Sequence, residues 1–190
     1  MGRRIVIVQG HPDPRGDRFG HALAAAYERG ARAAGHELRL IDVARLDFPL
    51  LATREDWETG CVPPALADAQ VSLLWAEHIA VFFPLWLGTM PARLKGFLEQ
   101  VLRPGMVTEN GRAVPWNRVL AGRSARVVVT MGMPALWYRW VYFAHGVRGL
   151  ERSVLAFSGV GPIRETLIGL IESGHARHAR WLARMEKQIG

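Results

Sequence analysis

Buried strands are the clearest signal in the pattern of hydrophobic and polar positions along the chain. β-Branched and other apolar residues run together without alternation in three segments, at 4–8, 79–83 and 126–131. Segments 37–41 and 153–157 carry weaker forms of the same pattern. Continuous apolar runs of this length are typical of strands that are covered on both faces, as in a parallel sheet. The chain is therefore expected to contain five strands.

Helical periodicity fills the intervals between these strands. The most regular apolar stripe follows the third strand and has the i, i+3, i+4 spacing of an amphipathic helix, with Leu94, Phe97, Leu98, Val101 and Leu102. Shorter stripes follow the first strand, with Phe19, Leu23 and Tyr27, and close the chain, with Trp181, Met185 and Ile189. Strands that alternate with helices predict right-handed βαβ units and a doubly wound parallel sheet with helices on both faces. Five strands in this arrangement are typical of a flavodoxin-like α/β fold with strand order 2-1-3-4-5.

The chain has 190 residues, which suits one well-buried core. It contains no internal repeat and no linker rich in Pro, Gly and Ser, so residues 1–190 are expected to form a single domain. Two segments without clear periodicity, 46–64 and 106–115, are expected to be surface elements at the sheet edge. The second has Asn110-Gly111 at its centre and predicts a small hairpin.

Composition and charge change this picture only a little. The net charge of +7 comes from 24 Lys and Arg against 17 Asp and Glu, which fits an anionic ligand, a membrane surface or nucleic acid. The arginines are scattered, however, so we interpret the charge mainly as a solubility feature with a minor share in anion binding, and expect no nucleic-acid partner. Cys61 is the only cysteine, which excludes an internal disulfide and suits a reducing compartment. The longest apolar stretch, 79–92, is interrupted by two prolines and a glycine, so a cytoplasmic protein with at most peripheral membrane association is expected.

Several common site motifs are missing from the sequence. GxGxxG and GxxxxGK[ST], the fingerprints of dinucleotide-binding and P-loop proteins, do not occur. HExxH and GxSxG, which mark zinc proteases and hydrolases with a nucleophile elbow, are also absent, and no metal site is expected. Phosphate binding therefore needs another scheme.

The loop after the first strand, QGHPDPRGDRFGHA at 9–22, is the first candidate for such a scheme. It is rich in turn residues and leads directly into a helix, whose first N–H groups and positive dipole end suit a phosphate. His11 and Arg18 are placed to add donors or charge. The alternative is an ordinary strand-to-helix connection in which Asp17 only caps the helix.

Two further loops are expected at the same edge, because ligands of open parallel sheets bind beyond the carboxyl ends of the strands. After the third strand, PLWLGT at 84–89 offers the flat surface of Trp86 and a flexible backbone at Gly88, against which a planar cofactor could lie. The alternative is that Leu85, Trp86 and Leu87 are core or dimer contacts. After the fourth strand, the segment 127–146 has an aromatic run that also permits contact with a membrane surface.

Together, three groups of residues resemble the NAD(P)H:quinone oxidoreductase family of flavodoxin-like flavoproteins, including its modulator-of-drug-activity and potassium-efflux ancillary types. They are the segment 6–12 with its loop to Phe19, the block FPLWLGTMPARLKGFLEQV at 83–101, and Thr130 and Gly132 followed by His145-Gly146. The central block is the most specific. The resemblance implies a homodimeric NAD(P)H dehydrogenase that binds FAD, or alternatively FMN, and reduces quinones by two-electron ping-pong hydride transfer. A second hypothesis is a regulatory flavoprotein subunit of a membrane transporter.

The resemblance also assigns roles position by position. The phosphate-binding loop of the family matches His11, Arg18 and Phe19. The segment against the isoalloxazine ring matches Pro84, Leu85, Trp86 and Leu87. The segment near its pyrimidine rim matches Thr130, Met131 and Gly132. The catalytic pair is expected to be Tyr138 and His145.

This chain departs from the family pattern in two places. Arg18 stands where the family often has serine, which exchanges a hydroxyl for a charged donor. The family's T-T-G-G is T-M-G-M here, and the spacing to His145 is longer, so either Tyr138 or Tyr142 is the counterpart of the family's tyrosine.

Overall fold

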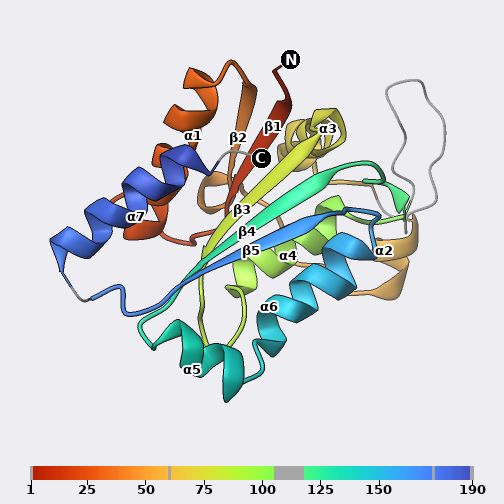
Figure 1. Ribbon diagram of the computed structural model, residues 1–190. Coiled ribbons are helices and arrows are strands. Elements are labelled where there is room, and N and C mark those ends of the chain that lie inside the picture. Colours follow the sequence, from red (N-terminus) through yellow and green to blue (C-terminus); the bar gives the residue numbers. More distant parts are fainter. Residues whose placement is uncertain (1, 60, 105–117, 173, 189–190) are drawn as a thin grey trace.

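In the computed structural model, which describes residues 2–59, 61–104, 118–172 and 174–188, five parallel strands form one sheet in the order β2-β1-β3-β4-β5 (Figure 1). The strands are β1 (Arg4–Gln9), β2 (Glu37–Asp42), β3 (His78–Pro84), β4 (Ser124–Thr130) and β5 (Ile163–Ile168). The expected flavodoxin-like topology is therefore confirmed. The central strand β3 is buried along its whole length, as its continuous apolar run predicts.

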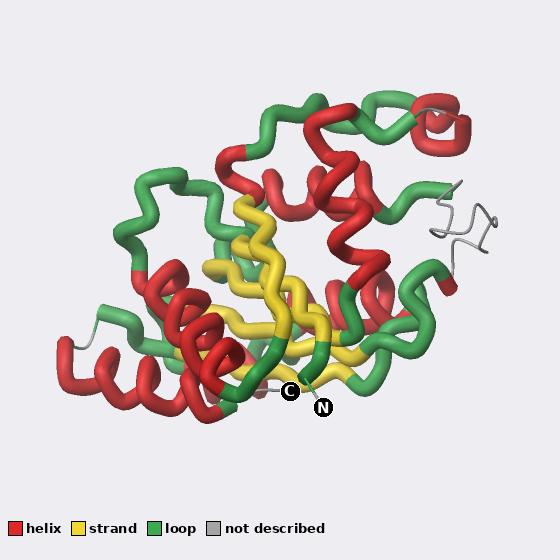
Figure 2. The backbone as a smooth tube through the Cα atoms, turned by 90° about the horizontal axis from the view of Figure 1, so that it is seen from above, coloured by secondary structure: helices red, strands yellow, loops and turns green. Residues whose placement is uncertain are grey.

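Two layers of helices cover the sheet, one on each face (Figure 2). On one face, α1 (Phe19–Ala33) and α7 (His175–Lys187) pack on a cluster that contains Ile5, Ile7 and Phe82. On the other face, α3 (Ala67–Trp75), α4 (Ala92–Val101) and α6 (His145–Gly149) cover a larger cluster built around Val81, Val127 and Val129. The α4 stripe predicted from sequence points into this larger cluster.

The remaining elements are short. After β2 come the 3-10 turn η1 (Val43–Arg45), α2 (Arg54–Thr59) and the 3-10 turn η2 (Pro64–Leu66); α5 (Ala135–Trp140) follows β4. Residues 43–49 lie over α4, because Arg93 donates to the Val43 carbonyl at 3.0 Å and to the Leu46 carbonyl, and Gln100 donates to the Pro49 carbonyl at 2.7 Å. The hairpin predicted at 106–115 lies outside the described residues.

One predicted strand is wrong. Segment 153–157 does not pair with the sheet, because most of it belongs to the π-helical segment η4 (Leu150–Ala156) that continues α6. A short apolar run has the same composition in a buried helical turn and in a strand, and here it packs as a helix through Leu155 and Val154. The fifth strand is β5 instead. Its Arg164 and Glu165 interrupt the apolar run, because an edge strand is only partly covered.

Candidate active site

Three loops meet beyond the carboxyl edge of the sheet, where the topology predicts a ligand site. They are the loop after β1, the turn after β3 and the segment that joins β4 to α5 and α6. Hydrogen bonds connect the second to the third, since the Leu85 N–H donates to the Thr130 carbonyl at 2.8 Å. A ring contact connects the first to the second: His11 meets the Trp86 ring edge-on at 6.1 Å between centroids.

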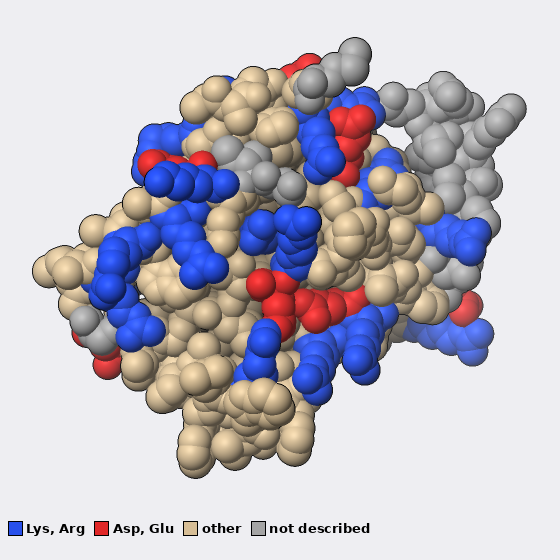
Figure 3. Space-filling model, viewed as in Figure 1, with Lys and Arg blue, Asp and Glu red and all other residues tan. Residues whose placement is uncertain are grey.

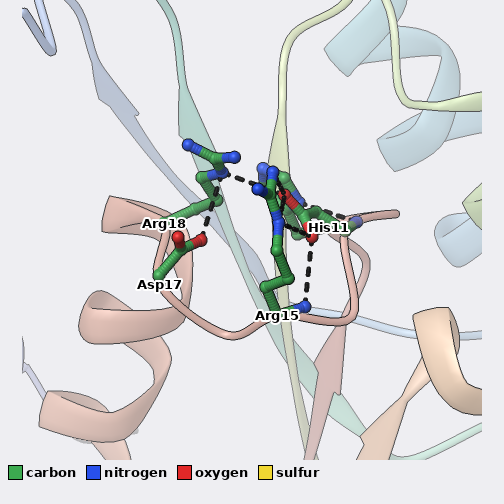
Figure 4. Close-up of polar contacts among 5 residues, drawn as sticks. His11, Arg15, Asp17 and Arg18 are labelled. Atoms are coloured by element: carbon green, nitrogen blue, oxygen red, sulfur yellow. Dashed lines mark hydrogen bonds and ion pairs between the residues drawn. The ribbon is translucent and has the colours of Figure 1, made fainter.

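The loop after β1 is held by a chain of side-chain contacts (Figure 4). The buried Gln9 accepts from the His11 N–H at 3.1 Å, and His11 Nδ1 accepts from the Asp13 N–H at 3.1 Å. The Asp13 carboxylate then accepts from Arg15 Nη2 at 2.7 Å and from Arg18 Nε at 3.0 Å. Charged side chains thus organise the loop, and its two guanidinium groups share one carboxylate.

These contacts determine the protonation of the loop. Hydrogen bonds from Arg15 hold the pKa of Asp13 well below its usual range, so this carboxylate is ionised at neutral pH. Burial, and then the neighbouring His21, lower the pKa of His11. His11 is therefore neutral at pH 7, and because its Nδ1 accepts a hydrogen bond, its proton lies on Nε2.

His21 stands out in the first turn of α1, behind this loop. Both of its ring nitrogens are buried and have no hydrogen-bond partner among the described residues, and its ring lies 4.9 Å from that of His11. The α1 helix also has no side-chain cap, so Asp17 does not play that part. Unsatisfied buried polar groups are rare, and here they adjoin free helix N–H groups. The surroundings of His21 therefore suit a phosphate group.

Phe19 lies beside this position but faces away from it. Its ring stacks on His178 of α7 at 4.0 Å between centroids. Phe19 thus packs the start of α1 against α7.

The turn after β3 has an unusual backbone. Trp86 and Thr89 exchange two backbone hydrogen bonds of 2.9 and 3.0 Å, and the two residues between them both have positive φ, 47° at Leu87 and 81° at Gly88. This is the geometry of a tight primed turn, which glycine adopts freely and leucine at a cost of about 1–2 kcal/mol. Leu87 is fully exposed at the tip and Trp86 is half exposed. The strain is consistent with a turn shaped for contact with something outside it.

Two residues of the following segment hold this turn in place. Tyr138 is fully buried, and its hydroxyl donates to the Gly88 carbonyl at 2.9 Å and accepts from the Val147 N–H at 3.3 Å. Burial also raises the pKa of Tyr138. Gly146 lies so close to the turn that a Cβ there would be 2.1 Å from the Gly88 oxygen. Tyr138 therefore contacts the turn and not the open site.

His145 and Tyr142 are exposed on the same side. His145 Nδ1 lies 2.8 Å from the Tyr142 carbonyl, which can only accept, so Nδ1 carries a proton and Nε2 is the nitrogen free for other partners. A Cβ placed on Gly88 would lie 3.6 Å from this Nε2, so the imidazole borders the turn. The Tyr142 ring stacks loosely on Tyr138 at 6.4 Å between centroids.

At the end of β4, the three predicted residues separate. Thr130 and Met131 are buried, and their backbones bond to Leu85 and Ile168 within the fold. Only Gly132 is exposed at the edge. The structure thus gathers His11, Arg18, Trp86, Leu87, Gly132 and His145 around the edge, and places Phe19, Met131 and Tyr138 in packing positions behind it.

An apolar hollow of about 660 Å³ lies beside the turn. Trp86, Leu87 and Met90 line one side, and Gly149, Leu150 and Val154 of α6 and η4 line the other. Next to it, α5 and the residues after it expose a large apolar surface, made of Leu136, Trp137, Trp140, Val141, Tyr142 and Phe143. Figure 3 shows few charged side chains on the surface at α5, which is nearly all tan. Exposed patches of this extent mark interaction sites.

Sequence reasoning missed Gln9, Asp13 and His21. The first two look like ordinary loop residues until their hydrogen bonds are seen, and His21 carries no motif. Its only signal was its place in the first turn of a helix that follows a turn-rich loop. The described residues contain no cluster of three metal-ligating side chains. No helix in the described part of the chain combines the length and apolar composition that crossing a membrane requires.

A family model described as flavodoxin-like fold matches residues 3–189. The chain belongs to this family. A ribosyldihydronicotinamide dehydrogenase-like protein of Penicillium crustosum is 27% identical over 80% of this chain and 64% of its own length, so the chain spans slightly less than two thirds of that relative. A protein of Escherichia coli named as an uncharacterized NAD(P)H oxidoreductase is 30% identical over 70% of this chain and 71% of its own.

A third relative is named for its cofactor. The FMN-dependent NADH:quinone oxidoreductase of Ruegeria pomeroyi is 29% identical over 63% of this chain and 67% of its own length. Among solved structures, an NAD(P)H:quinone oxidoreductase from Methanothermobacter marburgensis superposes with a TM-score of 0.78 at 21% identity, over 98% of this chain and 95% of that one. The family resemblance seen in the sequence is confirmed.

Proposed function

We propose that this protein is an NAD(P)H-dependent oxidoreductase that reduces quinones or similar flat acceptors by two-electron ping-pong through bound FMN. One observation carries the proposal: a position suited to phosphate, beside the orphaned ring of His21, lies at the same sheet edge as a strained turn that exposes the flat side chain of Trp86. A flavin mononucleotide has a phosphate at one end and a planar ring at the other, which matches this pairing of sites.

FMN replaces FAD as the preferred cofactor. The sequence resemblance favoured FAD, but the relative from Ruegeria pomeroyi is named as FMN-dependent. FMN also needs only one phosphate position, and the start of α1, which has no side-chain cap, would supply it.

The phosphate end would be held by the first turn of α1, by His21 and by the arginines of the loop. Asp13 orients Arg18 and Arg15. It would keep them beside the phosphate position, and it neutralises part of their charge. His11 presents its Nε2 proton, since its Nδ1 is engaged within the loop. The helix N–H groups supply donors that need no further ordering.

The ring end would lie against 84–87, with Trp86 and Leu87 covering it and the exposed Gly132 beside it. Bound FMN would supply the redox chemistry. It would take two electrons from NAD(P)H and pass them to an acceptor that binds where NAD(P)H was bound. His145 borders the turn with Nε2 free. We assign to it the transfer of the proton that the reduced acceptor requires: Nε2 takes up a proton from water, and the doubly protonated ring then donates that proton to the acceptor. Tyr138 then acts as a positioning residue, because its hydroxyl is used by Gly88 and Val147.

The apolar surface of α5 supports a homodimer. Trp137 and Trp140 are more than half exposed on this helix, and Gly146, which follows the exposed segment in the chain, lines the hollow beside Trp86. A second copy placed there would exclude water from the ring end of the site. Trp140→Glu should convert a dimer into a monomer in sedimentation velocity, whereas a wild-type protein that sediments as a monomer at micromolar concentration would contradict the dimer. We also propose that residues 1–190 form one domain, since both hydrophobic clusters share one sheet, and that it works in the cytoplasm.

The experiment is to purify the protein, release its cofactor by denaturation and identify it, then to follow oxidation of NADH and NADPH with menadione as acceptor. FMN in the released material and menadione-dependent turnover are expected. A protein that takes up neither FMN nor FAD would rule out this function.

A further inference from the structure

A groove lined by arginines lies away from the proposed flavin site, between the edge strand β5 and helix α7. Its volume is about 530 Å³, and Arg126, Arg164, Thr166, Trp181, Arg184 and Gln188 contribute to its lining. Lys and Arg side chains gather over α7 and beside it over the sheet in Figure 3. Because β5 is the last strand and α7 packs mainly on α1, this part of the sheet face is left open.

Arg126 forms the floor of this groove. It lies on β4 opposite Arg164 of β5, and only 6% of it is exposed. One Nη1 group donates to Thr166 Oγ1 at 3.2 Å and to Gln188 Oε1 at 3.4 Å, which fixes the guanidinium in place. Its Nε is buried and finds no acceptor among the described residues. Burying a charge without a counterion is costly, and because Arg126 lines the groove, an oxyanion bound there would offset that cost.

The charges at the rim have the same sign. Arg164 and Arg184 are exposed, and within the described ranges no carboxylate forms an ion pair with either of them or with Arg126. Burial lowers the pKa of Arg126, and both rim arginines lower it further. Glu165 also lines the groove, but its carboxylate is paired with Arg139. The groove therefore concentrates positive charge without an internal counterion in the described residues.

Two neighbouring hollows extend the site. Arg184 and Trp181 also line a hollow of about 360 Å³ along α7, and the guanidinium of Arg184 stacks 5.1 Å above the Trp181 ring. On the other side, Arg164 borders a hollow of about 150 Å³ that contains Arg3 and His78. The Nε2 atom of His78 is buried there without a partner in the described structure. Arginine donors thus extend on both sides of Arg126.

We propose that this groove binds a small molecule through its phosphate groups, with Arg126 at the floor and Arg164 and Arg184 at the rim. Planar guanidinium groups match the oxygens of phosphate, and Trp181 offers a surface for an attached ring. The hollow shape favours a small ligand over a nucleic-acid duplex, because the convex backbone of a duplex does not reach a floor that is almost fully buried.

The test is calorimetric titration of the flavin-loaded protein with inorganic pyrophosphate and, separately, with ADP. Saturable binding at one site is expected, and Arg164→Gln and Arg184→Gln should each weaken it about tenfold through loss of a charge-assisted contact. Both residues are exposed, so both variants should fold. Arg54→Gln on α2 is the control, since it removes the same charge on the side of the molecule away from α7 (Figure 1).

Equal weakening by all three substitutions would mean general attraction between charges and would overturn the proposal, as would a lack of saturation. Tighter binding of ADP that Trp181→Ala abolishes would assign the groove to a nucleotide, whereas equal binding of both probes would assign it to free phosphates. A short DNA duplex that outcompetes both probes would also overturn the proposal. Menadione reduction should be unchanged in the Arg164 and Arg184 variants, so failure here is distinguishable from failure of the proposed function.

Discussion

The loop after β1 and the turn after β3 lie at the same edge of the sheet, but different forces hold them. The loop depends on charged side chains, since Asp13 gathers Arg15 and Arg18. The turn depends on backbone hydrogen bonds, on the buried hydroxyl of Tyr138 and on the absence of a side chain at Gly146. Charged contacts at an exposed surface weaken with salt and adapt to a ligand, whereas close packing does not. The phosphate side of the site should therefore be adjustable and the ring side rigid.

The largest effect is expected from Gly146→Ala. The added Cβ would lie 2.1 Å from the Gly88 oxygen and 2.7 Å from Thr89 Cα, so backbone must move. We expect a loss of about 3 kcal/mol of unfolding free energy, as for overpacked cores, together with loss of flavin binding. Urea denaturation of the two proteins measures this.

Gly149→Ala is the matched control for that substitution. It lies on the same helix with nothing within 4 Å of an added Cβ. Its stability should stay the same or rise by up to about 1 kcal/mol, since alanine favours a helix. Equal losses in the two variants would mean that the turn is not held by close packing.

A smaller loss is expected from Tyr138→Phe. The change leaves the Gly88 carbonyl and the Val147 N–H without their shared partner, at a cost of about 1–3 kcal/mol. Tyr142→Phe alters an exposed residue and should stay within about 0.5 kcal/mol. Turnover of menadione in both variants separates positioning from catalysis. A fall in kcat for Tyr142→Phe without a loss of stability would make Tyr142 the catalytic tyrosine.

In the loop, the effect should be local. Asp13→Asn weakens the hold on Arg15 and Arg18 and should speed tryptic cleavage after these residues, with the melting temperature nearly unchanged. Asp17→Asn is the control, because in the described part of the chain Asp17 forms an ion pair with Arg18 alone, at 3.3 Å. If the two variants are cleaved at the same rate, Asp13 does not organise the loop.

The smallest effect concerns the protonation of His11. Burial and His21 lower its pKa below 6.5, so its contribution to stability is complete above pH 6.5 and is lost as the pH falls, because the unfolded state binds the proton first. His21→Gln removes the neighbouring imidazole and should raise the pKa of His11 in an NMR titration. His36→Gln, at a distant histidine, should leave it unchanged. A pKa of His11 above 6.5 in the wild-type protein would contradict the assigned burial.

The sequence was a good guide where a signal is repeated along the chain. Four of five strands and the stripe of α4 follow from continuous or periodic apolar residues, and these fix the edge at which the site lies. The fifth strand was missed because Arg164 and Glu165 interrupt the apolar pattern of β5. The apolar run at 153–157 predicts a strand instead, although a buried helical segment has the same composition.

Within the site, residue types were easier to predict than their contacts. Trp86 and Leu87 could be placed at the edge from the turn that contains them, and His11 from its loop. Whether a side chain faces the ligand or the core depends on packing between elements far apart in sequence. Tyr138 reaches Gly88 across 50 residues, and Phe19 stacks on a residue of the last helix. No local pattern encodes such pairs.

The most direct test of the account is the titration of FMN into flavin-free protein, followed by quenching of flavin fluorescence, for the wild type and Trp86→Ala. The account predicts one FMN per chain and binding about tenfold weaker in the variant, because stacking on an aromatic ring contributes about 1–3 kcal/mol. The variant should unfold at nearly the same urea concentration, since Trp86 is half exposed. Wild-type protein that does not bind FMN, or a variant that binds it equally well, would contradict the central claim.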